Sequence, residues 1–319
     1  MLAGVAMTMP HPQFDRLIDA ARRVGPVRVA VAHPCDRSSL EAALDAFKIG
    51  LIVPVLVGPR SRILRAAEES NLDIGMLELI DTPHSHASAA RGVELVRAGQ
   101  AEALMKGSLH TDELMGAVVD SVTGLRTARR LSHCFVMEVP GRAEPLIITD
   151  AAVNIIPTLA DKVDIVQNAI DLAHVLGFEE VRVAILAAVE TVNPRMPATI
   201  DAAALCKMAD RGQITGAMLD GPLAMDNAID PEAAAIKNLV SPVAGRANVL
   251  VTPDLEAGNM LAKSLSFMAG AGAAGIVLGA RVPIILASRS DSVEARLASC
   301  AVAVLVAHRS LAGKPLLGA

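Results

Sequence analysis

A serine and an arginine stand side by side at the end of an apolar run, in the segment LASRSDSVEAR, residues 286–296. The run predicts a strand that delivers Ser288 and Arg289 to the start of the last helix. Arginine offers paired N–H donors to a phosphate, serine adds a hydroxyl, and a helix N-terminus carries partial positive charge. Asp291 or Ser292 could be an ordinary helix cap, but a cation at a helix N-terminus is unfavourable unless an anion lies beside it. The segment therefore predicts a phosphate site at Arg289.

A second polar cluster follows another predicted strand, in MKGSLHT, residues 105–111. Lys106, Gly107 and Ser108 end the strand, and Thr111 is expected to cap the next helix. Free N–H groups at that helix start, together with the Lys106 ammonium, could hold a phosphate. The alternative is an ordinary threonine cap beside a surface lysine. Because capping does not require lysine followed directly by glycine, we favour the phosphate-binding interpretation.

Two further segments place polar residues after strands. ITDAAVNIIPT, residues 148–158, carries Asp150 and Asn154, for which a turn stabilised by their side chains is the favoured interpretation when the segment is taken alone. TPDLEAGNMLAK, residues 252–263, carries Gly258 and Asn259. A glycine inside a helix costs about 1 kcal/mol relative to alanine, and such a cost often marks close packing or a bound ligand.

The run GAGAAG, residues 270–275, matches the dinucleotide-binding pattern G-x-G-x-x-G. That pattern needs a strand before the glycines and a helix after them, so that the pyrophosphate meets a helix N-terminus. Here a predicted helix precedes and a predicted strand follows. We interpret the glycines as a helix C-terminus that turns closely into a strand.

These segments must be positioned by a sheet covered with helices. Short β-branched runs alternate with longer alanine-rich segments of helical period, which predicts a largely parallel α/β sheet. The runs 133–139 and 145–150 are joined by a short polar turn, so they must be antiparallel neighbours. Helices are expected at residues 85–98, 255–268 and 291–308. The remaining predicted strands occupy residues 27–33, 51–58, 76–81, 103–107, 181–186, 215–223, 248–254, 275–280 and 282–288.

The composition is that of a globular chain with an aliphatic core. The 319 residues predict about two domains. Hydrophobic residues make up 52% of the chain, and it has five Phe but no Trp or Tyr. A net charge of −5 provides no broad positive field, and the near absence of aromatic residues removes the stacking platforms of single-strand binders. We therefore expect no nucleic-acid partner, whereas an anionic small molecule remains possible.

The cysteine spacing and the N-terminal residues indicate the cellular compartment expected for the protein. The four cysteines are far apart in sequence, with neither a C-x-x-C pair nor zinc-ligand spacing, so we expect free thiols, a reducing environment and no metal. The first residues lack the basic region of a signal peptide. The longest apolar runs fall far short of the roughly 18 residues that span a bilayer. We expect a cytoplasmic protein without membrane contact.

Six segments resemble the phosphate acetyl/butyryltransferase family, in the family's order and over nearly the whole chain. The resemblance implies a two-domain, three-layer αβα fold similar to isocitrate and isopropylmalate dehydrogenases. Residues 1–124 and 281–319 would form one domain and 125–280 the other, with the site in the cleft between them. The activity implied is reversible transfer of an acetyl or butyryl group between coenzyme A and phosphate, in a homodimer without a bound cofactor. The segments are MKGSLHT, RRLSHCFVMEV, ITDAAVNIIPTLAD, GPLAMDNAID, GRANVLVTPDLEAGNMLAK and IILASRSDS.

The resemblance assigns Ser288 and Arg289 to the acyl phosphate. The acetyltransferases carry their proposed base, an aspartate, seven residues after the serine, where this chain has Ala295. The form SRSDS with Glu294 is more similar to the butyryltransferase branch. Asp291 is therefore our candidate base, followed by Glu294 and Asp150.

The remaining assignments concern the phosphate, the acyl group and coenzyme A. The arginine that follows the His-Thr helix start in acetyltransferases is absent, because residues 114–116 are Leu, Met and Gly. His110 and His133 could titrate, although a lone histidine is more often structural. Without Trp or Tyr, we expect aliphatic walls and phosphate contacts, rather than stacking on a large aromatic side chain, to hold coenzyme A. The candidate substrate-binding residues are Lys106, Gly107, Ser108, Ser132 as a lining of the acyl pocket, Asp150, Asn154 and Asn259.

Two alternatives stay open from the sequence. An NAD-dependent decarboxylating dehydrogenase on a similar fold would need a carboxylate cluster for Mg²⁺ or Mn²⁺ and several arginines on one helix, and the sequence shows neither pattern. A non-catalytic acyl-CoA or phosphate-binding protein is suggested by Ala295, which replaces the expected aspartate.

Overall fold

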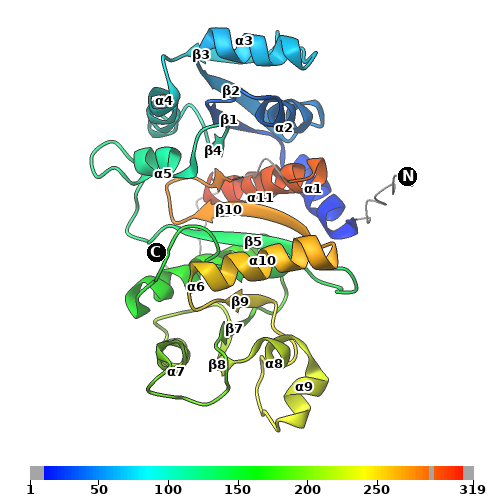
Figure 1. The fold of residues 1–319 in the computed structure, drawn as a ribbon, viewed down its shortest axis with the longest axis vertical. Helices are drawn as coiled ribbons and strands as arrows, with labels where there is room; N and C mark the ends of the chain where they lie inside the picture. The colour runs from blue at the N-terminus through cyan, green and yellow to red at the C-terminus, as the bar shows by residue number, and fades with distance from the viewer. Residues whose placement is uncertain (1–10, 287–290, 312–319) are drawn as a thin grey trace, which may run out of the picture.

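One mixed sheet runs the length of the molecule, from β3 at one end to β8 at the other (Figure 1). The computed structural model describes residues 11–286 and 291–311. Within them the strand order is β3-β2-β1-β4-β11-β10-β5-β6-β9-β7-β8. The strands are β1 (Val27–Ala32), β2 (Ile52–Gly58), β3 (Glu78–Asp81), β4 (Ala103–Lys106), β5 (Ser132–Glu138), β6 (Leu146–Thr149), β7 (Arg182–Leu186), β8 (Met218–Leu223), β9 (Val249–Val251), β10 (Gly272–Leu278) and β11 (Ile284–Ile285).

Helices cover both faces of this sheet, so the three-layer α/β class predicted from the sequence is confirmed. Phe14 of α1, Leu40 of α2 and Val304 of α11 belong to the core on one face. The opposite face is covered by α4 and α5 at one end and by α8, α9 and α10 at the other. The helices are α1 (Pro12–Val24), α2 (Arg37–Lys48), α3 (Arg60–Glu69), α4 (Ser85–Arg97), α5 (Thr111–Val119), α6 (Leu159–Val175), α7 (Pro197–Asp210), α8 (Met225–Ile229), α9 (Pro231–Ile236), α10 (Leu255–Ala269) and α11 (Val293–Leu311).

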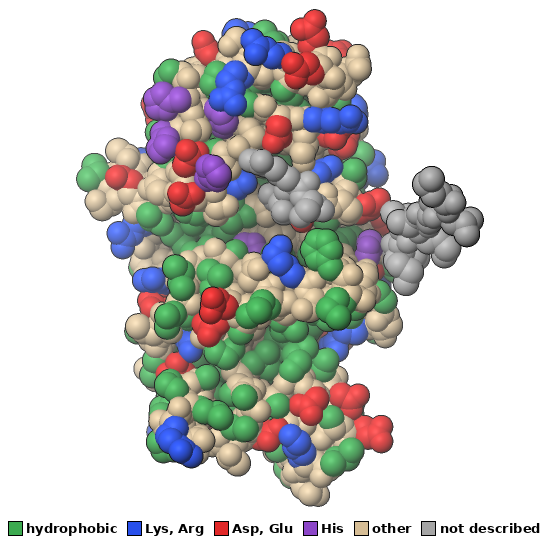
Figure 2. Space-filling model, in the orientation of Figure 1, with side chains coloured by type: hydrophobic (Ala, Val, Ile, Leu, Met, Phe, Trp, Pro, Cys, Tyr) green, Lys and Arg blue, Asp and Glu red, His purple; other side chains and the backbone are tan. Residues whose placement is uncertain are grey.

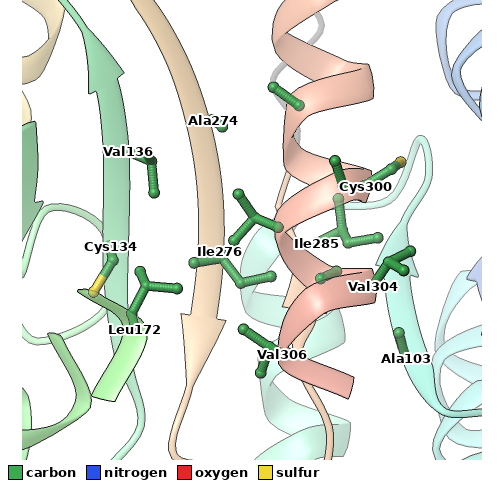
Figure 3. Close-up of a cluster of buried hydrophobic side chains, with 14 of the residues drawn as sticks. Ala103, Cys134, Val136, Leu172, Ala274, Ile276, Ile285, Cys300, Val304 and Val306 are labelled. Atoms are coloured by element: carbon green, nitrogen blue, oxygen red, sulfur yellow. The ribbon is translucent and has the colours of Figure 1, made fainter. Parts of the chain in front are cut away.

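The core beneath α11 is built from small and medium aliphatic side chains. Figure 3 shows Val306 of this helix on the side of Ile276 of β10, and Cys300 and Val304 on the other side, near Ile285 of β11. All five side chains are almost completely buried. Close packing of Ala, Val and Ile thus takes the place of the large aromatic side chains that the chain lacks.

Strand direction reverses in the middle of the sheet. β1, β2, β3, β4 and β11 are parallel to one another, but β10 is antiparallel to both β11 and β5, and β5 is antiparallel to β6. β6, β9, β7 and β8 are again mutually parallel. The carboxyl ends of β4 and β11 therefore lie at one edge of the sheet, and those of β6 and β9 lie at the opposite edge.

Most predicted elements occur within about two residues of their expected bounds, and the antiparallel pairing of β5 with β6 is confirmed. The strand expected at residues 215–223 begins only at Met218, and the last helix begins at Val293 rather than at residue 291. The strand predicted at residues 282–288 is shorter, spanning Ile284–Ile285, and the last two predicted positions lie outside the described residues.

The glycine-rich run, residues 270–275, connects a helix C-terminus to a strand, as interpreted from the sequence. Gly270 ends α10 in the left-handed conformation, with φ of +68°, and β10 begins two residues later at Gly272. Because a helix precedes the glycines and a strand follows them, the run does not present a helix N-terminus to a dinucleotide.

The predicted division into two domains stays a prediction. Both parts share the sheet, since β11 pairs with β10 through Ile276–Ile285 and Val277–Ile284. None of the helices in the described ranges combines the length and apolar character that crossing a membrane requires.

Candidate active site

The strand ends that carry the two predicted phosphate segments lie next to each other. β11 pairs with β4 through Ile285 and Met105, so the next residues along, Leu286 and Lys106, lie at the carboxyl ends of neighbouring strands. Neighbouring strands are about 5 Å apart. Ser288 and Arg289 lie outside the described residues, two and three positions after Leu286.

Gly107 and Ser108 join the end of β4 to the end of β1. The Gly107 N–H donates to the Ala32 carbonyl at 2.9 Å, and a Cβ at Gly107 would lie 2.4 Å from the same oxygen. The Ser108 hydroxyl donates to the His33 carbonyl at 2.8 Å and accepts from the Cys35 N–H at 3.1 Å. Only glycine allows this close approach, which explains the glycine after Lys106 by packing.

The helix after this segment is capped one residue earlier than predicted. Thr111 is the first residue of α5, and His110 is the N-cap. The carboxylate of Glu113 accepts the His110 N–H at 3.3 Å and the Ser85 hydroxyl at 3.1 Å. The expectation that Thr111 is the cap was therefore wrong, because the chain already turns into the helix at His110 and a carboxylate from the first turn completes the cap.

The start of α11 is held by a serine cap and by a buried arginine that the sequence analysis did not single out. The Ser292 hydroxyl accepts the Ala295 N–H at 3.1 Å, as expected for a cap. Arg296 is only 8% exposed and donates from Nη1 to the Asp291 carbonyl and to the Ser38 hydroxyl, both at 3.1 Å. Its Nε has no partner. A cation at a helix N-terminus is unfavourable unless an anion lies beside it, and this holds for Arg296 as it does for Arg289.

A pocket of about 260 Å³ opens between the last two turns of α10 and the first turn of α11. Its floor comes from the start of β10, from Phe135 of β5 and from Leu286. The pocket contains Asp291, the candidate base, and Ala295, the position where the sequence lacks the expected aspartate. The full lining is His11, Phe135, Ala262, Lys263, Ser266, Phe267, Gly270, Ala271, Gly272, Ala273, Leu286, Asp291, Ser292 and Ala295.

Asp150 and Asn154 lie at the opposite edge of the sheet and form a closed turn. Asp150 accepts the N–H groups of Ala152, Val153 and Asn154 at 3.0–3.1 Å, and the Asn154 amide at 2.5 Å. Asn154 in turn accepts Arg130 Nε at 2.8 Å. Both carboxylate oxygens of this buried aspartate are used, so the geometry supports the turn interpretation.

Gly258 and Asn259 fasten α10 to this turn. A Cβ at Gly258 would lie 2.4 Å from the Asp150 carbonyl, and the Asn259 amide donates to the Ala151 carbonyl at 3.1 Å. The glycine in the helix is thus explained by close packing. The same contacts set the position of α10, which forms a wall of the pocket.

Ser132 and His133 point to opposite faces of β5. Ser132 is fully buried and accepts the Asn168 amide of α6 at 2.9 Å. His133 is also buried, and its ring lies edge-on to Phe135 at 4.4 Å between centroids. Burial lowers the pKa of His133 to about 4, and its Nδ1 has no partner. His133 is therefore neutral near pH 7 and lies beside a residue of the pocket floor.

All four cysteines are free thiols, as predicted. Burial raises the pKa of Cys35 to about 11 and that of Cys134, Cys206 and Cys300 to about 12. Only the thiolate is a good nucleophile, so these side chains are poor candidates for attack on an acyl group. Over residues 11–286 and 291–311, no three or more His, Cys, Asp or Glu side chains are grouped so that they could hold a metal ion.

Comparison with known proteins shows which family this chain resembles. Residues 85–304 match the family described as phosphate acetyl/butaryl transferase. The chain is 63% identical to a phosphate acetyltransferase of Rhizobium meliloti over 302 residues, which cover 95% of the chain and 96% of the relative. It is 40% identical to a phosphate butyryltransferase of Clostridium acetobutylicum, over 92% of the chain and 98% of the relative.

Two solved structures resemble this chain in fold. A branched-chain phosphotransacylase from Enterococcus faecalis is 31% identical, with a TM-score of 0.77, over 88% of this chain and 99% of that one. A 4-hydroxythreonine-4-phosphate dehydrogenase from Klebsiella pneumoniae, 13% identical with a TM-score of 0.52, covers 88% of this chain and 99% of its own. The second likeness concerns the fold alone.

Proposed function

The chain belongs to the phosphate acetyl/butaryl transferase family, and from this premise we propose that it transfers a short acyl group between coenzyme A and phosphate at the pocket beside α11. We place the reaction in this pocket because Asp291, Ser292 and Ala295, which follow the Ser288–Arg289 pair in the sequence, line it. Coenzyme A acts as a substrate, and we propose that no further cofactor takes part.

The reaction needs a base, an acyl site and a cationic phosphate site. In the direction of thioester formation, the thiol of coenzyme A loses its proton and its sulfur attacks the carbonyl carbon of the acyl phosphate. A carbon–sulfur bond forms, the bond from carbon to the phosphate oxygen breaks, and phosphate leaves with the electron pair. A free thiol has a pKa of about 8.5, so a carboxylate in the pocket assists the proton transfer.

We assign the proton transfer to Asp291. It lies in the pocket, whereas both oxygens of Asp150 are taken up by its own turn at the other sheet edge. Arg296 supports the assignment because it binds the Asp291 carbonyl and so fixes the backbone there. Asp291→Asn should lower kcat about 100-fold or more. Glu294→Gln, on the same helical turn, is the matched control and should stay near wild type. The reverse pattern would overturn the assignment.

We assign the phosphate to Arg289, Ser288 and Lys106. Lys106 leaves β4 next to Leu286, which begins the segment that carries the other two. Cations stabilise the negative charge of the departing phosphate, which makes them part of the rate enhancement rather than of substrate binding alone.

The acyl group is proposed to be acetyl. The relatives support this choice, because identity to the Rhizobium meliloti acetyltransferase is 63%, against 40% to the Clostridium acetobutylicum butyryltransferase. The SRSDS segment, which is closer to the butyryltransferase branch, argues the other way.

The deciding experiment incubates the purified protein with phosphate and either acetyl-CoA or butyryl-CoA, and follows release of free thiol. Faster release from acetyl-CoA is expected. Faster release from butyryl-CoA would overturn the acetyl assignment. No release from any short acyl-CoA would overturn the proposed function. Reduction of NAD by a hydroxy-diacid would instead favour the dehydrogenase alternative.

We also propose a homodimer in the cytoplasm. Hydrophobic side chains gather on the lower half of the face in Figure 2, over α10 and the elements below it. Met260 of α10 is exposed, as are Ile155 and Ile156 in the segment before α6. Light scattering after size exclusion should give twice the chain mass of 33.1 kDa, and a single chain mass would contradict the dimer. Four free thiols fit a reducing compartment.

A further inference from the structure

An aromatic side chain and a lysine stand together at the rim of the pocket, on α10. The ring of Phe267 is 74% exposed, and the ammonium group of Lys263 lies 6.0 Å from its centroid. Both residues line the pocket. We propose that Phe267 and Lys263 bind the nucleotide end of coenzyme A, with the ring stacked on the adenine and the ammonium group on a phosphate. The inference rests on the proposed function.

The exposure of Phe267 is the first support. The chain has five Phe and no Trp or Tyr, and Phe267 is the one Phe whose side chain is exposed. Phe14 and Phe135, by contrast, are packed in the core and in the pocket floor. An aromatic side chain left in water forgoes its burial energy, and its free face is the surface on which a base stacks.

The charge beside the ring is the second support. Lys263 precedes Phe267 by four residues, so the two side chains are neighbours on one face of α10. In the described part of the chain, Lys263 makes no ion pair with a carboxylate. A nucleotide with several phosphates needs a cation within reach of its base, and this rim provides one.

The layout of the pocket is the third support. The opposite wall is the first turn of α11, with Asp291, and the floor contains Leu286, which precedes the Ser288–Arg289 pair. A molecule whose nucleotide rests on the α10 rim would therefore extend its thiol arm across the pocket towards the candidate base. This direction is the one that the proposed transfer requires.

This placement changes the expectation drawn from composition. Without Trp or Tyr, the sequence predicted that aliphatic walls and phosphate contacts alone would hold coenzyme A. A single exposed Phe at the pocket rim is enough to add a stacking surface.

The competing explanation is that Phe267 is covered by a second copy of this chain. Met268, its neighbour on α10, is 86% exposed and does not line the pocket. A protein interface would use both side chains, whereas a nucleotide site would use Phe267 only. Met268→Ala is therefore the matched control.

The test compares two thioesters that share the reacting end. Acetyl-CoA carries the nucleotide, and S-acetylpantetheine lacks it. For Phe267→Ala we expect the KM for acetyl-CoA to rise about 5- to 100-fold, the range that loss of one base–aromatic stack gives. The KM for phosphate, and the kinetics with S-acetylpantetheine, should match wild type. Lys263→Gln should also raise the KM for acetyl-CoA selectively, and Met268→Ala should change neither thioester.

The possible outcomes distinguish failure of the nucleotide site from failure of the proposed acyltransferase function. If wild type releases thiol from acetyl-CoA but Phe267→Ala keeps the wild-type KM, the nucleotide site is refuted and the acyltransferase stands. If wild type releases no thiol from any short acyl-CoA, the proposed function itself fails. If Phe267→Ala and Met268→Ala both reduce the molecular mass in light scattering, with no selective change in KM, the rim is an interface between copies.

Discussion

Replacing Gly258 with alanine sets two opposing effects against each other. Inside a helix, alanine is favoured over glycine by about 1 kcal/mol. Against this, the new Cβ would lie 2.4 Å from the Asp150 carbonyl and 2.7 Å from the Thr252 hydroxyl. Ordinary carbon–oxygen contacts are about 3.3 Å or longer, so α10 or the turn must move by about 1 Å. Overpacking of this kind costs about 1–3 kcal/mol.

The upper end of that range applies, because the closest neighbour is backbone of a turn that is already closed by Asp150. After subtraction of the helix propensity, Gly258→Ala should lower the free energy of unfolding by about 2 kcal/mol. Gly116 is the matched control, since it lies inside α5 and a Cβ there would meet nothing within 4 Å. Gly116→Ala should raise the free energy of unfolding by up to about 1 kcal/mol.

Thermal and urea unfolding of the two variants measure this difference. For a chain of this size, 1 kcal/mol shifts Tm by about 2–3 °C, so Gly258→Ala should melt about 5 °C below wild type. Gly116→Ala should melt slightly above it. If both substitutions raise Tm equally, then α10 does not rest on the turn after β6, and the packing explanation for this glycine is refuted.

Three other predictions concern charge and pH. Arg289→Ala should lower activity at least about 100-fold with little change in Tm, because it removes a cation from the departing phosphate; retained activity would exclude Arg289 from the mechanism. Burial lowers the pKa of His133 to about 4, so the unfolded chain takes up this proton near pH 6.5 while the folded chain stays neutral. The contribution of His133 to the free energy of unfolding is therefore complete above pH 6.5 and is lost as the pH falls towards 4. In urea unfolding, His133→Leu should lose less stability than wild type between pH 6.5 and 4. An equal loss in both proteins would contradict this role of His133. Glu138 accepts the N–H groups of Gln13 and Phe14 at 2.9 and 2.8 Å, so Glu138→Ala should remove about 1–2 kcal/mol by uncapping α1, and an unchanged urea midpoint would disprove that role.

The elements were predictable because their periodicities are local. Alternating β-branched runs gave the strands of both parallel groups, and the short turn between β5 and β6 required antiparallel pairing. The run at Gly270 could be interpreted correctly because a dinucleotide site depends on the order of strand and helix, which the sequence itself displays.

The grouping of site residues was not predictable in the same way. Lys106 and Asp150 both follow strands, yet they lie at opposite edges, because three successive antiparallel pairings, β11–β10, β10–β5 and β5–β6, reverse the strand direction between them. That reversal depends on which strands pair, and pairing is not encoded in any single segment. The Phe267 rim was missed for a related reason, since it becomes a candidate site only where the fold places the start of α11 opposite the end of α10.

The raised pKa values of the cysteines have a consequence for a protein that handles activated acyl groups. Acyl phosphates and thioesters acylate any thiolate they meet. A thiol with a pKa of about 11, as for Cys35, is ionised in about one molecule in 10,000 at pH 7, against about 3% for a free thiol. Cys134, Cys206 and Cys300 are ionised even less. The fold thereby protects the protein from acylation by its own substrates and leaves the thiol of coenzyme A as the acceptor.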